Sequence, residues 1–189
     1  MKALQTRWVG AGKAYDGSPL ASHWTYKTFG ILGDSLVAFS GPCDVRVGAL
    51  ADLEDAKAGA YIYSPQMLHF ILELFGPGLE LGAARQWLLV ATLQAELNAL
   101  LKGRALVRRR GNDLFVGRRK LSVSIAAPTP VSVKVHLGVN ILTKGAPVPA
   151  IGLTELKVKP LALVKAVLEA SGRDHAGLAK ARTKVRAVE

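Results

Sequence analysis

The chain has 189 residues and a formal net charge of +11, and half of its residues are hydrophobic, which suits a single domain with a sizeable core. One cysteine excludes an intrachain disulfide framework. No apolar run reaches the roughly 18 residues that span a bilayer, and the first ten residues lack the apolar region of a signal peptide, so we expect a cytoplasmic protein with no membrane contact.

In the first part of the chain, the pattern predicts strands separated by helices. A first strand is expected over residues 3–9. A helix is expected over Ser18–Phe29, because a capping hydroxyl precedes proline at the first helical position. A buried strand is expected over Ser35–Phe39, broken by the Gly-Pro pair that follows it. The acidic cluster Asp52–Asp55 is expected in a loop, and a second amphipathic helix over Ser64–Phe75.

The second part begins with the longest helical pattern, over residues 79–102, and then changes period. Residues 105–142 look like strands joined by tight turns, ending in a long strand over Val131–Leu142. The prolines at 147 and 149 predict a loop. The tail, from about Leu161 to Val185, predicts two basic helices split near Gly172.

Strands on either side of a block of helices, with hairpins in the second half, predict the α+β class, with a mostly antiparallel sheet packed with helices. We expect one domain over residues 1–189. Its catalytic-like core would cover about 30–145 and its basic helical C-terminal segment about 155–189.

The charge is divided unevenly between the halves. Residues 1–101 carry 7 Lys/Arg and 9 Asp/Glu, whereas residues 102–189 carry 18 and 5. Such asymmetry favours an anionic partner for the second half, whether nucleotide phosphate, nucleic acid or an acidic protein. A solvated basic surface is the alternative that charge alone leaves open.

The stretch 108–126 carries the clearest chemical pattern. Asn112 and Asp113 open one predicted strand, and Lys120 opens the next, across a turn that contains Gly117. A hairpin of this length brings residues on its paired strands together. The lysine would supply positive charge to a phosphate or a developing oxyanion, and the carboxylate of Asp113 would hold the lysine or a magnesium ion. A hairpin whose charges face only water is the alternative.

The same residues resemble a known signature. Asn112–Val116 followed by Arg119–Leu121 is similar to the catalytic domain of biotin and lipoate protein ligases, a core like that of class II aminoacyl-tRNA synthetases. There an Asn-Asp pair opens a strand and a Lys-Leu or Lys-Ile pair follows a short turn. His136–Asn140 is similar to a later Gly-x-x-Asn strand of those families. The resemblance covers about residues 79–142. It implies a biotin/lipoate ligase-like fold in which Lys120 binds the carboxylate and the adenylate phosphate of an acyl substrate.

The whole chain also resembles a prokaryotic family of unknown function and similar length. The stretches that carry this resemblance are Gly33–Phe39, Gly41–Val45, Asp52–Asp55, Ile62–Pro65 and Met67–Phe70. It implies that these polar stretches belong together and brings no activity with it. The glycine- and arginine-rich adenylate loop of biotin ligases, and the Arg-Arg-x-x-Gly-Gly-Gly stretch of lipoate ligases, have no counterpart here.

We expect the site to be built around Lys120 and His136 as catalytic residues, the first to stabilise negative charge and the second as a proton shuttle. The ligand-binding positions expected around them are Asn112, Asp113, Arg110, Ser122, Ser124, Asn140, Gly41 and Cys43. ATP and Mg are the cofactors of this hypothesis, and the partner is a small carboxylic acid or a nucleotide. The histidines and the cysteine show no metal-ligand spacing, so no protein metal site is expected.

Several polar residues have ordinary alternatives. Cys43 follows a Gly-Pro pair and would be exposed as a nucleophile at a strand end, but a lone cysteine is more often a small buried apolar residue. His69 lies between apolar residues and is expected to be packed or hydrogen-bonded. The acids at 52–55 would bind a cation or simply face water.

The predicted function is binding of a carboxylic acid or acyl-adenylate, with acyl transfer if the protein is an enzyme. The rival from another class is a nucleic-acid-binding module that uses the basic half. Its weakness is that Phe115 is the only aromatic residue after position 101, which disfavours base stacking. A non-catalytic member of the fold is a third alternative, and a homodimer is compatible with all three.

Overall fold

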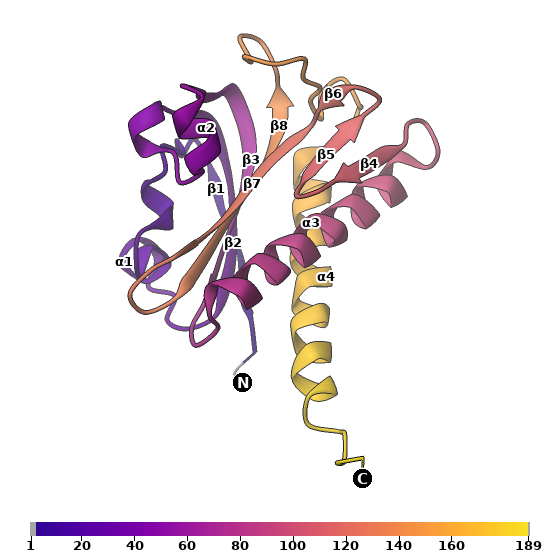
Figure 1. Cartoon of the computed structure of the whole chain (residues 1–189). Helices are drawn as coiled ribbons and strands as arrows, with labels where there is room; N and C mark the ends of the chain where they lie inside the picture. Colours follow the sequence, from indigo (N-terminus) through magenta and orange to yellow (C-terminus); the bar gives the residue numbers. More distant parts are fainter. Residues whose placement is uncertain (1–2, 189) are drawn as a thin grey trace.

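The computed structural model describes residues 3–188; residues 1, 2 and 189, which the predicted domain includes, lie outside the described residues. Two sheets and the helices beside them make up the fold (Figure 1). Within residues 3–188 no helix has the length and apolarity needed to cross a membrane. The elements in chain order are β1 (Gln5–Ala11), the 3-10 turn η1 (Ser18–Leu20), α1 (Trp24–Phe29), β2 (Ser35–Val45), the 3-10 turn η2 (Val47–Ala49), α2 (Leu53–Lys57), β3 (Ile62–Leu74), α3 (Leu79–Leu101), β4 (Val107–Arg110), β5 (Asp113–Val116), β6 (Arg119–Lys120), β7 (Ser122–Pro128), β8 (Val133–Leu142) and α4 (Pro160–Ala181).

The larger sheet has the strand order β1-β2-β3-β8-β7, with β1 parallel to β2 and every other pairing antiparallel. The smaller sheet, β4-β5-β6, is antiparallel throughout. The predicted α+β class with a mostly antiparallel sheet is therefore confirmed. The small sheet lies over one end of α3, where its buried Leu114 joins the main core (Figure 1).

The larger sheet is buried on both faces. On β3 the side chains of Leu68, Phe70 and Leu72 join the core beneath α3 and α4, while Met67 and Ile71 join a second core on the opposite face. Alternation of this kind follows from the pleat of a strand. Figure 1 shows α3 and α4 on one side of the sheet and the short helices α1 and α2 on the other. We call the side with α3 and α4 the helix-covered face, and the side with the short helices α1 and α2 the open face.

The helix predicted over Ser64–Phe75 is wrong, because these residues form most of β3. A central strand buried on both faces gives a continuous apolar run, which carries no period of two and imitates a buried helix. Pro65 is tolerated in this central strand because the register with both neighbouring strands shifts beside it.

Three smaller expectations also need correction. The helix expected over Ser18–Phe29 is divided into η1 and α1, because His23 adopts a left-handed conformation between them. The acids at 52–55 form the start of α2 and not a loop. The carboxylate of Asp52 caps this helix, because it accepts hydrogen bonds from the backbone N–H groups of Glu54 and Asp55. Strand β2 runs through the Gly-Pro pair to Val45.

The tail is one helix, not two. Helix α4 continues through Gly172, because its buried stripe extends from Leu163 to His175 and packing along it outweighs the roughly 1 kcal/mol cost of a helical glycine. The expectation of a long helix over 79–102 is confirmed by α3, and the predicted hairpin by β5 and β6, which are joined through Gly117 at a φ of 60°.

Candidate functional site

The β5–β6 hairpin brings the predicted Asp113 and Lys120 into direct contact. The ammonium Nζ of Lys120 lies 2.7 Å from Oδ2 of Asp113, and both side chains are partly buried. The backbone around the lysine is fixed from two sides, because its N–H donates to the carbonyl of Pro149 at 2.8 Å and its carbonyl accepts from the N–H of Ile151 at 3.0 Å. The ammonium therefore stands in a defined position.

This ion pair lines a cavity of about 260 Å³ on the open face of the sheet. Five of the predicted site residues meet there: Asn112, Asp113, Lys120, Ser124 and His136. The remaining walls come from Tyr15, from residues 45–55 around α2, and from apolar side chains of the sheet and the following loop. A cavity of this kind, apolar with a few convergent polar groups, is the usual form of a small-molecule site.

Asn112 and Ser124 fasten one wall of this cavity. The side-chain amide of Asn112 donates to the carbonyl of Ser124 at 3.0 Å, and the Ser124 hydroxyl donates to the carbonyl of Asn112 at 2.8 Å. Gln86 of α3 donates to the same hydroxyl at 2.7 Å. These reciprocal bonds tie the small sheet to β7 and hold the hairpin over the cavity.

His136 is part of a buried histidine pair. Its Nε2 lies 3.1 Å from Nδ1 of His69, and Nε2 of His69 lies 3.3 Å from the carbonyl oxygen of Gly41. Burial holds the pKa of His69 down to about 4 and the pKa of His136 well below its ordinary value, so both rings are neutral near pH 7.

The carbonyl of Gly41 fixes the tautomers. Since a carbonyl only accepts, the single proton of neutral His69 is on Nε2, and its Nδ1 is a lone pair. The proton between the two rings then belongs to Nε2 of His136, which leaves Nδ1 of His136 as an unprotonated acceptor. Across residues 3–188 this Nδ1 has no hydrogen-bond partner. His136, which lines the cavity, is thus a neutral ring with one unprotonated nitrogen.

Tyr15 covers the pair. Its ring stacks on His136 with 3.6 Å between the ring centroids, and only 3% of the residue is exposed. Burial is the largest cause that holds the pKa of the Tyr15 phenol above its ordinary range, so the group stays protonated. Its hydroxyl has no hydrogen-bond partner within the described chain, which leaves a donor for a ligand in the cavity.

Two further acids line the cavity. Asp52 and Asp55 join Asp113 there, so three carboxylates and one lysine share the lining. Burial raises the pKa of Asp113, Lys120 opposes this shift, and the charges of Asp55 and Asp52 add to it. No cluster of three or more His, Cys, Asp or Glu side chains suited to a metal ion occurs in residues 3–188. A magnesium ion bound together with phosphate usually takes only one or two protein carboxylates, so such a cluster is not a requirement for it.

The other predicted ligand-binding residues do not line this cavity. Arg110 is exposed and lies over the ring of Phe115, 5.1 Å from its centroid. The hydroxyl of Ser122 accepts from the N–H of Leu114 at 2.9 Å. The side-chain amide of Asn140 donates to the carbonyl of Lys120 at 3.3 Å and so holds the lysine backbone. Ligand contacts for these residues stay predictions.

Gly41 and Cys43 lie on β2, behind the cavity. A side chain at Gly41 would place a Cβ 1.9 Å from the carbonyl oxygen of Lys13, so only glycine fits this close approach. Cys43 is fully buried, and burial raises the pKa of its thiol to about 12. A buried protonated thiol is a poor nucleophile, and its expected ligand contact stays a prediction.

Sequence reasoning missed the contribution of Tyr15 and underrated His69, Asp52 and Asp55. The sequence offers one signal for the last three residues. The stretches around Gly41, Asp52 and His69 are among those that carry the resemblance to the prokaryotic family of unknown function. Nothing in the sequence connected Tyr15 with them, because the contact depends on β1 lying beside β2 and on a bridge between Tyr15 and Cys43.

A family described as "Domain of unknown function (DUF366)" matches residues 4–186. "Uncharacterized protein MJ0805" from Methanocaldococcus jannaschii is 35% identical over 153 residues, which cover 78% of this chain and 68% of that protein. A solved structure titled "Protein of Unknown Function from Pyrococcus horikoshi" is 40% identical, with a TM-score of 0.89, and the match covers 98% of this chain and 100% of that one.

More distant structures share the fold. The biotin protein ligase from Aquifex aeolicus in complex with biotin and ATP has a TM-score of 0.59 at 15% identity, covering 92% of this chain and 71% of that one. Ta0514 from T. acidophilum, a putative lipoate protein ligase with bound lipoic acid, has a TM-score of 0.60 at 11% identity, covering 93% and 87%. The predicted biotin/lipoate ligase-like fold is therefore confirmed, and at these identities the likeness concerns the fold alone.

Proposed function

Since this chain belongs to the family described as "Domain of unknown function (DUF366)" and has the fold of biotin and lipoate protein ligases, we propose that it binds a small carboxylic acid, or its adenylate, and supports acyl transfer. One observation carries the proposal. The ammonium of Lys120, anchored 2.7 Å from Asp113, lines a cavity of about 260 Å³ on the sheet.

Each wall of the cavity has a role in this function. Lys120 would bind the carboxylate or phosphate oxygens and stabilise negative charge as the acyl group is transferred. Nδ1 of His136 would accept a proton or hydrogen bond from the attacking group, and the Tyr15 hydroxyl would donate one. Apolar side chains would hold the hydrocarbon part of the acid: Val45, Ile62, Val123, Ile125 and Val148.

ATP and magnesium are the cofactors that we propose for the activating step. The three carboxylates that line the cavity would repel a bare anion, so a bound nucleotide needs a cation with it. Asp113 and Asp55 are the residues that would hold magnesium. The bound ion would neutralise the negative charge of the phosphates. The ion pair with Asp113 would hold the ammonium of Lys120 beside the acyl group that is transferred.

The test is a calorimetric titration of the full chain with octanoate, lipoate, biotin and ATP, with and without magnesium. We expect saturable binding of at least one acid or of ATP with magnesium, and a loss of tenfold or more in Lys120→Ala. Lys165→Ala removes an exposed lysine of α4, away from the cavity, and should bind like the wild type. The proposal fails if no ligand binds, or if both variants bind equally.

A second candidate rests on the small sheet. Arg108, Arg109 and Arg110 of β4 and the neighbouring Arg118 are all exposed, and an exposed arginine cluster is the electrostatic footprint of nucleic-acid binding. RNA or DNA affinity that falls steeply with salt, with a shallower slope in Arg108→Ala, would support this candidate. Weak binding that is insensitive to salt would remove it.

A further inference from the structure

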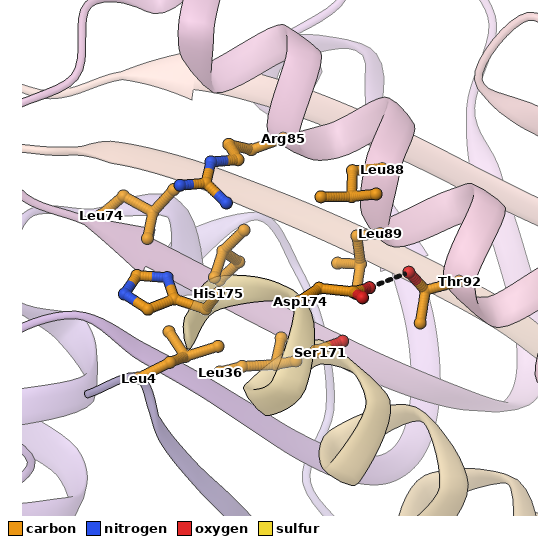
Figure 2. Close-up of a pocket in the computed structure, with 11 residues that line it drawn as sticks. Leu4, Leu36, Leu74, Arg85, Leu88, Leu89, Thr92, Ser171, Asp174 and His175 are labelled. Atoms are coloured by element: carbon orange, nitrogen blue, oxygen red, sulfur yellow. Dashed lines mark hydrogen bonds between the residues drawn. The ribbon is translucent and has the colours of Figure 1, made fainter. Parts of the chain in front are cut away.

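A second cavity lies on the helix-covered face, between α3, α4 and the sheet (Figure 2). The cavity has a volume of about 30 Å³, enough for roughly two water-sized groups. Six leucines form most of its wall: Leu4, Leu36, Leu72, Leu74, Leu88 and Leu89. It shares no lining residue with the cavity beside Lys120.

Two buried polar atoms in this cavity lack partners. Across residues 3–188, neither Nε2 of His175 nor the hydroxyl oxygen of Ser171 has a hydrogen-bond partner. His175 is 4% exposed, and its Nε2 is 4.0 Å from Oδ2 of Asp34, too far for a direct hydrogen bond. A buried polar group without a hydrogen-bond partner destabilises the folded state, so these atoms indicate that a polar group completes the cavity.

The nearby acids already have partners. Thr92 of α3 donates to Oδ2 of Asp174 on α4 at 2.8 Å, a bond that Figure 2 draws across the cavity. Oδ1 of Asp34 accepts from the N–H of Phe75 at 2.8 Å. The unsatisfied hydrogen-bonding capacity in this cavity therefore belongs to His175 and Ser171.

A groove of about 280 Å³ adjoins the cavity and shares Leu74, Arg85 and His175 with it. The charged side chains that the argument uses in this groove are Arg85 and Asp34. Arg85 is partly buried, and within the described chain it makes no ion pair or hydrogen bond, although the charge of Asp34 acts on it. Figure 2 shows its guanidinium on the same side of the cavity as Leu74 and His175.

We propose that this cavity is a second binding site, for a short aliphatic carboxylate of about propionate size, with the carboxylate at Arg85 and His175 and the hydrocarbon end among the leucines. A planar carboxylate matches the two parallel donors of a guanidinium. The inner wall of leucines favours a CH₂–CH₃ end over a fully hydrated anion such as phosphate. Asp34 disfavours a dianion and leaves the groove suited to a single negative charge.

Such a ligand would bridge α3, α4 and the sheet, because Arg85, His175 and Leu36 come from three different elements. It would satisfy Nε2 of His175 and stabilise the docking of α4. This site lies on the face of the sheet opposite Lys120, and it does not depend on the function proposed for that cavity.

The test is a titration of the full chain with sodium propionate at constant ionic strength, followed by calorimetry and by the NMR signals of the histidine side chains. We expect saturable binding that shifts the His175 signals, with an affinity that is taken from those signals alone. Propylamine, of the same size and opposite charge, should not bind. Propionate bound in the cavity beside Lys120 would instead shift the His136 signals, so the two sites are measured separately.

Arg85→Met should weaken propionate binding at least tenfold, because it removes the charge and keeps the length of the side chain. Arg173→Met is the matched control, since Arg173 is an exposed residue of α4 that does not line the cavity. If Arg85→Met does not fold, Arg85→Lys keeps the charge and should still bind more weakly. The proposal is overturned if the wild type does not bind, if the Arg85 variants bind as tightly as the control, or if chloride and phosphate shift the His175 signals equally, which would leave only water in the cavity.

Discussion

The two faces of the five-stranded sheet have the same strands and opposite chemistry. On the helix-covered face, β3 and β8 contribute Leu68, Phe70, Val135 and Leu137 to a core beneath two long helices. On the open face, the same strands carry a row of buried polar groups: His69, Glu73, Lys134 and His136. Beneath the long helices the sheet packs through leucine and valine side chains. On the open face, loops and short helices provide the hydrogen-bonding groups that buried polar side chains need.

Glu73 and Lys134 show how the open face supports charge in its interior. Both side chains are fully buried, with 2.9 Å between Oε2 and Nζ. The same carboxylate also accepts from the backbone of His23 and from the hydroxyls of Thr25 and Ser132. This network joins α1 and the loop before β8 to the sheet, and so holds one edge of the open face.

Breaking that pair should have the largest effect on stability. Lys134→Met leaves the carboxylate of Glu73 buried without its counter-charge, so the free energy of unfolding should fall by about 3–5 kcal/mol. Urea unfolding at pH 7 measures it. The double variant Lys134→Met with Glu73→Gln is the control and should lose less than the single variants together. A loss below about 1 kcal/mol in Lys134→Met would show that the pair does not hold this face.

The histidine pair should make stability depend on pH. The pKa of His69 falls from 6.5 to about 4 in the folded protein, so the unfolded chain binds a proton between these values and the folded chain does not. Stability from this group is complete above pH 6.5 and is lost as pH falls towards 4. The difference corresponds to about 3 kcal/mol.

His69→Asn should therefore unfold with a flatter dependence on pH between 7 and 4.5 than the wild type. Urea unfolding at both pH values is the measurement. His23→Asn is the control, because His23 takes no part in the pair and asparagine tolerates its left-handed backbone. Equal pH dependence in His69→Asn and the wild type would contradict the neutral histidine pair.

A smaller effect is expected on the helix-covered face, where one polar contact joins the two long helices. Thr92→Val removes the bond to Asp174 and leaves a partly buried carboxylate without it, so unfolding free energy should fall by about 1–2 kcal/mol. Thr183→Val, near the exposed end of the chain, should change stability by less than about 0.5 kcal/mol. If both variants behave alike, the contact does not contribute to helix packing.

Much of the fold could be predicted from local pattern. Helix α3 is predicted over nearly its full length, because leucine and alanine recur at helical spacing along its 23 residues and Gly103 follows its end. The hairpin was predicted because Gly117 and the flanking strands are adjacent in sequence. Strand β3 could not be predicted, since burial of both its faces depends on strands β2 and β8, which flank it.

The candidate site divides in the same way. Asn112, Asp113 and Lys120 were found together because they lie within nine residues of sequence and one hairpin holds them. His136 was selected as part of the same sheet, but its partner His69 lies 67 residues away and was predicted in a helix. The tautomer of His136 follows only from the position of Gly41 on a third strand.

The sequence by itself determined the α+β class, the long helix, the Asp113–Lys120 hairpin and the basic second half, because these depend on composition and on neighbours along the chain. Only the tertiary structure decided which face of each strand carries chemistry, which acids approach Lys120, how the histidines share their protons, and where the second cavity lies. These depend on contacts between distant segments, and burial in the folded chain sets the charge state of each group that meets there.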